Sequence, residues 1–270
     1  MSNRPIGVFD SGVGGLSVLR ALRAELPHET FIYVADSGHA PYGERDDGYL
    51  IDRAHAIVNW FTQSHQIKAL VVACNTATAA AIHVLRQAYP DMPIVGIEPA
   101  LKPAVAQSKT KVIGVMATRS TLNSDKFKRL LASLDDQARF VLQPCSGLAP
   151  AIEEFNATKI GAACAEYTRA MGTFGSKSGE IDTLVLGCTH YPFAEASLRL
   201  GTGPTVTYLE GGSPVAQQTR RLLAGVNQLS AEPLTDAINV KLFSSGYPPA
   251  LASAARRWLN LEAEAFSLRE

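Results

Sequence analysis

Two cysteines stand in matching settings in the sequence. Cys74 follows the apolar run Leu70-Val71-Val72-Ala73, and Cys188 follows Leu184-Val185-Leu186-Gly187. Each run is typical of a buried strand, and the residues after each cysteine are typical of a helix start. The partial positive charge of a helix N-terminus favours the thiolate form of a nearby cysteine. Two such thiols can act as a redox pair, or they can move protons on two sides of one substrate.

The other two cysteines, Cys145 and Cys164, do not end an apolar strand in this way. A cysteine without a polar setting is more often a small buried hydrophobic residue than a catalyst, so we expect both to be structural. The sequence contains no Cys-x-x-Cys pair, and the four cysteines fit neither a zinc motif nor a disulfide framework. We therefore expect reduced thiols in the cytoplasm and no metal.

Small polar residues beside both thiols suit the binding of a carboxylate. Asn75 and Thr76 follow Cys74, and Thr189 follows Cys188. Together with the backbone N–H groups at the helix starts, their side chains are suited to an anionic group. Thr76 could instead cap a helix. The grouping of these residues around thiols favours a functional interpretation.

Three ionisable residues extend this chemistry. Asp10 and Glu153 are suited to hold a substrate ammonium or to orient a base, and His190 is suited to tune Cys188 or to relay its proton. By residue type alone, Asp10 could be a helix cap and His190 an ordinary turn residue.

Two loops could approach a ligand. Gly12-Val13-Gly14-Gly15 lacks the G-x-G-x-x-G spacing, because Ser17 stands where the third glycine belongs, and it lacks the end of a P-loop. A tight turn close to a small ligand is the better interpretation. Pro41-Tyr42-Gly43 has the composition of a surface turn, but in an active site it would wall in a substrate.

The elements that must position these residues alternate between strands and helices. This order predicts β-α units, with mostly parallel sheets flanked by helices on both faces. The expected strands are 6–9, 31–34, 70–73, 94–97, 112–116, 184–187, 206–209 and 240–244. The expected helices are 16–26, 51–61, 78–89, 125–133, 156–172, 211–223 and 249–259.

The pattern begins again in the second half of the chain. Ile113-Gly114-Val115 repeats Ile6-Gly7-Val8, at a spacing similar to that between the two cysteines. This tripeptide is common in buried strands, but two matches in the same order indicate an internal duplication. We expect two pseudo-symmetric α/β lobes, 1–97 with 210–270 and 98–209. Ligands bind at the carboxyl ends of parallel strands, so we expect the active site in the cleft between the lobes.

Composition excludes several classes of partner. Lys and Arg number 25, Asp and Glu also number 25, and neither sign forms a long run. A strong electrostatic footprint for nucleic acid or an anionic membrane is therefore absent from the sequence. No apolar run approaches the ~20 residues of a transmembrane helix. We expect no signal peptide and a small-molecule substrate as the partner.

Four segments resemble the signatures of bacterial glutamate racemases, in the aspartate/glutamate racemase family. They occur in the right order and spacing, and the resemblance covers the chain to about Ala216. The segments are Val8-Phe9-Asp10-Ser11-Gly12-x-Gly14-Gly15-Leu16, Pro41-Tyr42-Gly43, Ala73-Cys74-Asn75-Thr76-Ala77 and Leu186-Gly187-Cys188-Thr189-His190-Tyr191-Pro192. The resemblance implies a cofactor-independent enzyme that interconverts L- and D-glutamate and supplies D-glutamate for peptidoglycan. It also implies two α/β lobes, a discontinuous first domain and a homodimer.

The resemblance also implies a role for each matching residue. Cys74 and Cys188 become the two catalytic acid/bases, supported by Asp10 and by Glu153 beside His190. The implied substrate contacts are Asp10, Ser11, Pro41, Tyr42, Gly43, Asn75, Thr76, Thr118, Thr121, Thr189 and His190.

Two segments depart from the family pattern. Residues 209–212 (Leu-Glu-Gly-Gly) stand where many members have an Asp-Ser pair, and residues 37–39 (Ser-Gly-His) vary a loop that often carries a Thr and a basic residue. These departures concern peripheral contacts and effector control, not the thiols. Three alternatives stay open: an aspartate racemase or related isomerase, a catalytically silent amino-acid-binding protein, and a thiol-redox protein. The missing Cys-x-x-Cys argues against the third.

Overall fold

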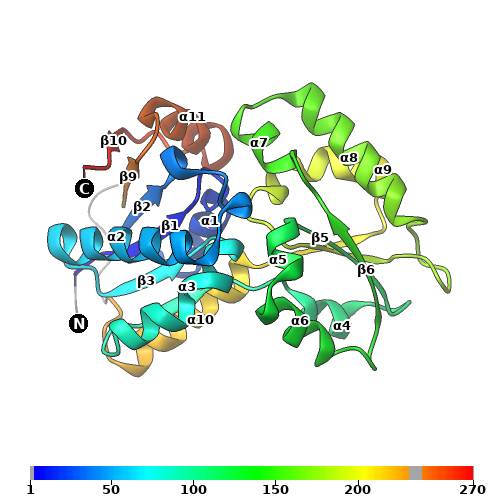
Figure 1. Cartoon of the computed structure of the whole chain (residues 1–270), viewed down its shortest axis with the longest axis horizontal. Coiled ribbons are helices and arrows are strands. Elements are labelled where there is room, and N and C mark those ends of the chain that lie inside the picture. Colours follow the sequence, from blue (N-terminus) through cyan, green and yellow to red (C-terminus); the bar gives the residue numbers. More distant parts are fainter. Residues whose placement is uncertain (1–2, 231–238, 270) are drawn as a thin grey trace. The chain divides into compact units, whose positions relative to one another are not determined.

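A computed structural model describes residues 3–230 and 239–269 of the chain. The chain divides into two compact units, Met1–Ile97 with Gly212–Glu270, and Glu98–Gly211. Each unit contains one parallel sheet with helices packed on both of its faces (Figure 1). Within the described residues, every helix is too short or too polar to cross a lipid bilayer.

The sheet of the first unit has six strands. Their order is β10 (Ala265–Ser267), β9 (Val240–Ser244), β2 (Phe31–Ala35), β1 (Ile6–Asp10), β3 (Ala69–Val72) and β4 (Ile94–Gly96). All five pairings are parallel. Strands β1, β2 and β3 are buried along their whole length, which explains their continuous apolar sequences.

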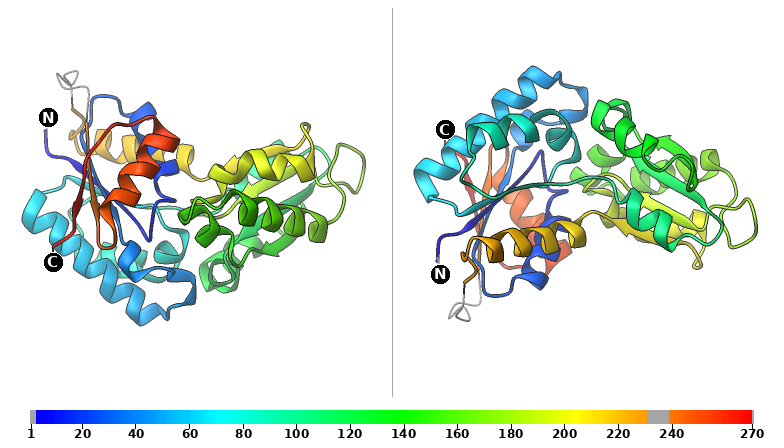
Figure 2. Two further views of the ribbon diagram at one scale, coloured as in Figure 1. Left: turned by 90° about the horizontal axis from the view of Figure 1, so that it is seen from above. Right: turned by 90° about the horizontal axis from the view of Figure 1, so that it is seen from below.

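Helices cover both faces of this sheet. One face carries α1 (Leu16–Glu25), α10 (Gly212–Gly225) and α11 (Pro248–Leu259), and the other carries α2 (Asp47–His65) and α3 (Asn75–Ala88) (Figure 2). Helix α2 begins after Asp46, whose side chain accepts a hydrogen bond from the Tyr49 N–H, and it ends at Gln66 in the left-handed conformation.

The sheet of the second unit has four strands, β6 (Arg139–Pro144), β5 (Val112–Ala117), β7 (Thr183–Leu186) and β8 (Thr207–Glu210), in that order. Helices α4 (Leu101–Gln107) and α6 (Asp125–Ala132) bury their apolar side chains against β5 and β7. Helices α8 (Ala157–Met171) and α9 (Glu195–Thr202) pack on one another, and α8 also packs against β6.

The two sheets repeat one topology. The order β2-β1-β3-β4 in the first unit recurs as β6-β5-β7-β8 in the second, again with parallel pairing throughout. Cys74 follows β3 and Cys188 follows β7, so the two thiols occupy equivalent places in the repeat. The predicted fold class, two pseudo-symmetric α/β lobes with parallel sheets flanked by helices, is confirmed.

Several elements differ from the sequence prediction. Strands β6 and β10 were not predicted, because their residues are half-buried or exposed and neither strand has a continuous buried apolar run. Helix α2 extends beyond the predicted range at both ends, and its last turn, 62–65, is polar and lacks the apolar spacing. After Cys188 the chain forms the short 3-10 helix η3 (Tyr191–Ala194) before α9 begins.

Candidate active site

Cys74 lies at the junction of a strand and a helix. It is the N-cap residue of α3, and its Sγ accepts a hydrogen bond from the Ala77 N–H at 3.5 Å. The Ser11 Oγ lies 3.7 Å from the same sulfur. A backbone N–H at a helix N-terminus stabilises a thiolate, so this position supports an anionic sulfur. The residue is buried, with 6% of its surface exposed.

Asp10 ends β1, and the next residue is Ser11, whose hydroxyl lies near this thiol. The Asp10 side chain is fully buried, and its Oδ1 accepts the Gly12 N–H at 3.0 Å. Helix α1 begins after Gly15, which is its N-cap residue and has no side chain to cap the helix. A Cβ atom on Gly15 would lie 2.5 Å from the Asp10 Cβ and 2.8 Å from the Tyr33 Oη. The glycine-rich turn therefore allows α1 to approach the carboxylate closely.

Asn75 and Thr76 form the first turn of α3, and both are buried. The Asn75 Oδ1 is buried and has no hydrogen-bond partner among the described residues. Buried polar atoms are nearly always satisfied, so such an atom next to a thiol indicates a place where a ligand supplies the missing partner.

Pro41, Tyr42 and Gly43 lie in a loop between β2 and α2, where residues 42–44 form the 3-10 helix η2. Tyr42 is only 2% exposed, and its hydroxyl donates to the Asp36 Oδ2 at 2.5 Å. Burial raises the pKa of Tyr42 well above its usual value, and the charge of Asp36 raises it further. The phenol is therefore directed into the protein and is a poor proton donor. Any contact of Tyr42 with a substrate must come from its backbone or ring.

In the second unit, Cys188 lies in a chain of three groups. Its Sγ is 3.6 Å from the His190 Nδ1, and the His190 Nε2 is 2.6 Å from the Glu153 Oε1. Burial by itself lowers the pKa of His190, but its bonds to Cys188 and Glu153 outweigh burial and raise the pKa well above its usual value. A protonated imidazole beside a sulfur stabilises the thiolate form.

Glu153 reaches His190 from the end of α7 (Leu148–Glu153). This short helix begins after Gly147, which has a φ of 87° and so needs the freedom of glycine. The Glu153 side chain is 28% exposed, and the His190 side chain is 6% exposed. The pair therefore lies at the edge of the buried region, with the imidazole on the inner side.

The threonines of the second unit follow neighbouring strands. Thr118 comes directly after β5 and is the N-cap of α5 (Arg119–Asn123), where its Oγ1 accepts the Thr121 N–H at 3.1 Å. Its hydroxyl also donates to the Thr121 Oγ1 at 2.9 Å. Thr189 follows Cys188 and is buried. Strand β5 is the equivalent of β1 in the repeat. Thr118 follows β5 and Asp10 ends β1, so each sheet places side-chain oxygen atoms at the end of the strand that neighbours the cysteine-bearing strand.

Cys145 and Cys164 are both buried, and the Cys145 Sγ donates a hydrogen bond to the Gln143 carbonyl at 3.3 Å. Burial raises the pKa of Cys145 far above its usual value and that of Cys164 to about 11. Both thiols are therefore protonated near neutral pH and are poor nucleophiles and bases. Within the part of the chain that the structure describes, no cluster of His, Cys, Asp or Glu could hold a metal ion.

Comparison with known proteins identifies the family. Residues 14–219 match the model of the Asp/Glu/Hydantoin racemase family. The chain belongs to this family. The family predicted from the four motifs is thus confirmed, and most of the residues described above lie inside the matched region.

Individual members of the family agree with this assignment. The glutamate racemase of Ralstonia pickettii is 49% identical over 222 residues, which are 82% of this chain and 76% of that protein. The crystal structure of Francisella tularensis glutamate racemase with D-glutamate has a TM-score of 0.81 and 25% identity, and it covers 100% of this chain and 98% of that one. The structure of Escherichia coli glutamate racemase with L-glutamate and the activator UDP-MurNAc-ala has a TM-score of 0.80 and 28% identity, with 98% of each chain covered.

Each unit of this racemase-family protein brings one group of predicted residues together. In the first unit Ser11, Asn75 and Thr76 lie near Cys74, and in the second unit His190 joins Glu153 to Cys188. Asp36 and Arg53, which hold Tyr42, were not predicted as site residues. Asp36 could have been recognised from the sequence because, like Asp10, it is an aspartate at the end of a buried strand.

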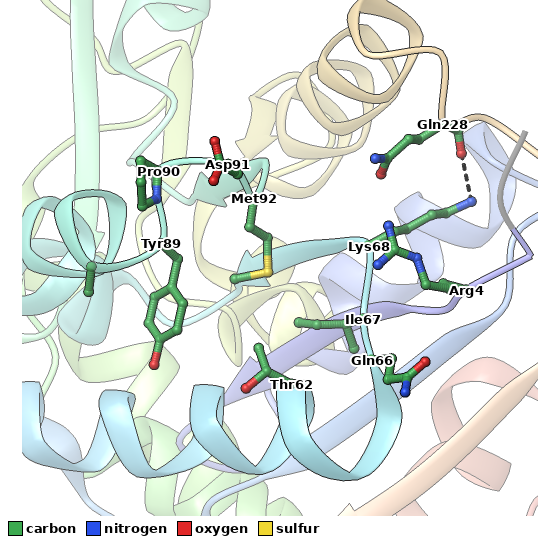
Figure 3. Close-up of a pocket in the computed structure, with 11 residues that line it drawn as sticks. Arg4, Thr62, Gln66, Ile67, Lys68, Tyr89, Pro90, Asp91, Met92 and Gln228 are labelled. Carbon is green, nitrogen blue, oxygen red and sulfur yellow. Dashed lines mark hydrogen bonds between the residues drawn. The ribbon is translucent and has the colours of Figure 1, made fainter.

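A separate cavity of about 640 Å³ lies in the first unit, before the amino-terminal ends of β3 and β4. Its lining includes Lys68, Tyr89, Met92 and Gln228 (Figure 3). The Lys68 Nζ donates to the Gln228 carbonyl at 2.8 Å and pairs with the Glu29 Oε2 at 2.6 Å. None of the predicted site residues lines this cavity. It lies at the amino-terminal end of the sheet, whereas the thiol of Cys74 lies at the carboxyl-terminal end.

Proposed function

We propose that this protein is a glutamate racemase that needs no cofactor and interconverts L- and D-glutamate with two cysteines. Family membership supports racemisation, and relatives have been seen with L-glutamate and with D-glutamate. The observation that carries the proposal is the equivalent placement of Cys74 and Cys188 after β3 and β7 of a repeated topology. Inverting one carbon needs a base on one face and an acid on the other, and the repeat supplies one thiol for each.

In the proposed reaction, one thiolate removes the Cα proton of glutamate, and the electron pair of the broken C–H bond stays on carbon. The opposite thiol then gives its own proton to the other face of Cα and becomes the new thiolate. The cysteines exchange roles between the two enantiomers. Cys74 is supported as a thiolate by the Ala77 N–H, and Cys188 is supported by the His190–Glu153 pair.

Binding of glutamate follows from the polar groups around each thiol. The unpartnered Asn75 Oδ1 and the carboxylate of Asp10 are acceptors suited to the substrate ammonium. Thr76, Thr189 and the N–H groups at the start of α3 are donors suited to a carboxylate. No pyridine ring delocalises the carbanion in this proposal, so fixed hydrogen bonds must stabilise the charge that develops at Cα.

The biological role implied by the motifs is the supply of D-glutamate for peptidoglycan in the cytoplasm, by a homodimer. Reducing conditions suit the chemistry, because oxidation of either catalytic thiol would remove a proton carrier. Light scattering on the purified protein tests the dimer, and complementation of a strain that depends on external D-glutamate tests the role in the cell wall.

The decisive experiment follows L- and D-glutamate by circular dichroism in the purified protein, without pyridoxal phosphate and in deuterated water. We expect loss of optical activity from either enantiomer, with deuterium entering at Cα. Cys74→Ser and Cys188→Ser should each reduce kcat/KM by about 10²–10⁴-fold, the usual contribution of a positioned acid or base. Cys164→Ser is the matched control and should keep full activity.

Three results would overturn the proposal. Full activity in either Cys74→Ser or Cys188→Ser would show that the two-thiol mechanism is wrong. Racemisation of aspartate in preference to glutamate would assign the chain to a different substrate. Binding of glutamate without any exchange at Cα would show a catalytically silent binding protein.

A further inference from the structure

A buried ionic network lies beneath the loop that carries Pro41, Tyr42 and Gly43. Asp36 follows β2 and is fully buried. The Arg53 Nη2 donates to the Asp36 Oδ1 at 2.8 Å, and the Arg53 Nε donates to the Asp36 Oδ2 at 3.1 Å. The Tyr42 hydroxyl donates to the same Oδ2 at 2.5 Å. Each oxygen of the carboxylate therefore has at least one donor.

This arrangement fixes the carboxylate in both position and orientation. The side chain of Arg53 is 10% exposed and that of Asp36 is 0% exposed, so water does little to screen the pair. A guanidinium that binds a carboxylate through two parallel N–H groups sets its plane as well as its distance. Arg53 lies in the middle of α2, a helix of 19 residues, so the anchor belongs to a rigid element.

The loop is also held at its start. The Gly38 N–H donates to the Ser245 Oγ at 3.1 Å, and a Cβ atom on Gly38 would lie 2.7 Å from the Ser245 carbonyl oxygen. The segment after β9 therefore packs closely on residues 37–39. With this contact before Pro41 and the Asp36 contact at Tyr42, little freedom is left to the residues between them.

Tyr42 connects this network to the reactive sulfur. The Tyr42 ring and Cys74 belong to the same buried cluster, and the negative charge of Cys74 is among the causes that raise the pKa of Tyr42. The 3-10 helix that begins at Tyr42 also contacts α3, whose N-cap is Cys74. The hydroxyl that Asp36 holds thus sets where the loop lies relative to the thiol.

We infer that Arg53 and Asp36 are positioning residues for glutamate binding, which act by fixing the Tyr42 hydroxyl and with it the substrate-facing loop of residues 41–43. The inference rests on the proposed function, because the resemblance makes these residues substrate contacts. Neither Arg53 nor Asp36 touches the substrate in this account. Tyr42 serves as the link, not as an acid or base.

A positioning role of this kind has a kinetic signature. In this proposal the loop contacts a part of glutamate away from Cα, so its contacts are equally strong in the ground state and in the transition state. Losing them raises KM and leaves kcat nearly unchanged. We expect Tyr42→Phe and Arg53→Met each to raise KM for both enantiomers about ten-fold, the loss that corresponds to one hydrogen bond to a charged group.

Two further variants separate positioning from general stability. Arg53→Lys keeps the positive charge but loses the two parallel N–H donors of the guanidinium. Its affinity for glutamate should therefore lie between those of Arg53→Met and the wild type. Lys68→Met breaks a similarly buried ion pair of the same unit, which Lys68 forms with Glu29 at the amino-terminal end of the sheet. This control should lower the melting temperature and leave KM unchanged. The double variant Tyr42→Phe/Arg53→Met should show the KM of one single variant, because both changes remove the same link.

The outcomes divide clearly. A raised KM with retained kcat in Tyr42→Phe, absent in Lys68→Met, supports the inference. A wild-type KM in both Tyr42→Phe and Arg53→Met overturns it, as does a fall in kcat alone, which would place the network in the chemical step. Should Arg53→Met fail to fold, Tyr42→Phe and Arg53→Lys give the same test. Failure of the wild-type protein to racemise glutamate would refute the proposed function instead, and the two failures are thus distinct.

Discussion

Replacement of Glu153 by glutamine tests how the second thiol is kept reactive. In the structure the Glu153 Oε1 lies 2.6 Å from the His190 Nε2, and the other ring nitrogen faces Cys188 at 3.6 Å. Glu153→Gln keeps the size of the side chain and can still accept a hydrogen bond, but it removes the negative charge. We expect a smaller fraction of protonated His190 and weaker support for the Cys188 thiolate.

The size of the effect follows from the geometry. A hydrogen bond to a charged group contributes about 1.5–3 kcal/mol, which corresponds to about 10- to 100-fold in a rate or equilibrium constant. The Glu153 side chain is 28% exposed, so solvent screens part of the attraction. We therefore expect kcat/KM to fall by about ten-fold, at the lower end of that range. The two enantiomers have equal free energies in water, so the fall must be the same in both directions.

The pH dependence gives the sign of the effect. The folded protein raises the pKa of His190 above its usual value, with hydrogen bonds to Cys188 and Glu153 outweighing burial. The support from protonated His190 is thus complete at low pH and is lost as pH rises through the raised pKa. In Glu153→Gln that loss should begin at lower pH, which moves the alkaline fall in kcat/KM toward neutrality.

The assay is kcat/KM against pH by circular dichroism, from each enantiomer in turn. Glu154→Gln is the matched control, since Glu154 is the next residue and pairs with Lys159 at 2.7 Å with both side chains largely exposed. An exposed pair of this kind contributes little, so the control should keep the wild-type profile. If Glu153→Gln shows the same rate and the same alkaline fall as the wild type, the His190–Glu153 pair does not support Cys188.

Three further changes test the scaffold. Gly15→Ala should reduce activity strongly, because its Cβ would lie 2.5 Å from the Asp10 Cβ and displace that carboxylate; steady-state kinetics with a circular dichroism spectrum of the fold measures this. Gly161→Ala, in α8 with no atom near the added Cβ, should stabilise the protein by about 0.5–1 kcal/mol in urea unfolding, and a destabilised variant would contradict the helix assignment. Asp182 is partly desolvated, but bonds from Ser108 and the N–H groups of Thr110 and Lys109 lower its pKa. The stability that the Asp182 carboxylate contributes is present above the pKa of an unfolded aspartate, about 3.9, and is lost as pH falls through the lowered folded-state pKa, so the free energy of unfolding of Asp182→Asn should depend less on pH below that value.

The buried centre of each sheet could be predicted from the sequence because it consists of uninterrupted apolar runs. Strand β9 was predicted with its observed bounds, and β1, β3 and β7 were within about one residue at each end. The edge strands β6 and β10 could not be predicted in this way. Strand β6 buries only part of its surface and carries polar residues such as Arg139 and Gln143, so its sequence lacks the apolar signal of a buried strand.

The candidate site shows the same limit for contacts between distant residues. Cys74 and Asn75 stand next to one another in sequence, so their grouping could be predicted. The pairing of Asp36 with Arg53 could not, because it depends on where α2 packs against the end of β2. Glu153 was expected beside His190 only through the family resemblance. The sequence alone has no pattern that joins Glu153, at the end of α7, to His190, two residues after Cys188.

The repeated topology also explains why the two thiols need different partners. Both cysteines follow the same strand of the repeat, but Cys74 is directly the N-cap of a 14-residue helix, whereas Cys188 is followed by a 3-10 helix of four residues. A single short turn aligns few peptide dipoles, so it supplies little of the positive charge that a longer helix N-terminus gives to Cys74. The second unit places an imidazole and a carboxylate where the first relies on backbone N–H groups. Activity from Cys188 should for this reason depend on pH through His190, while the support that Cys74 receives from Ala77 does not titrate.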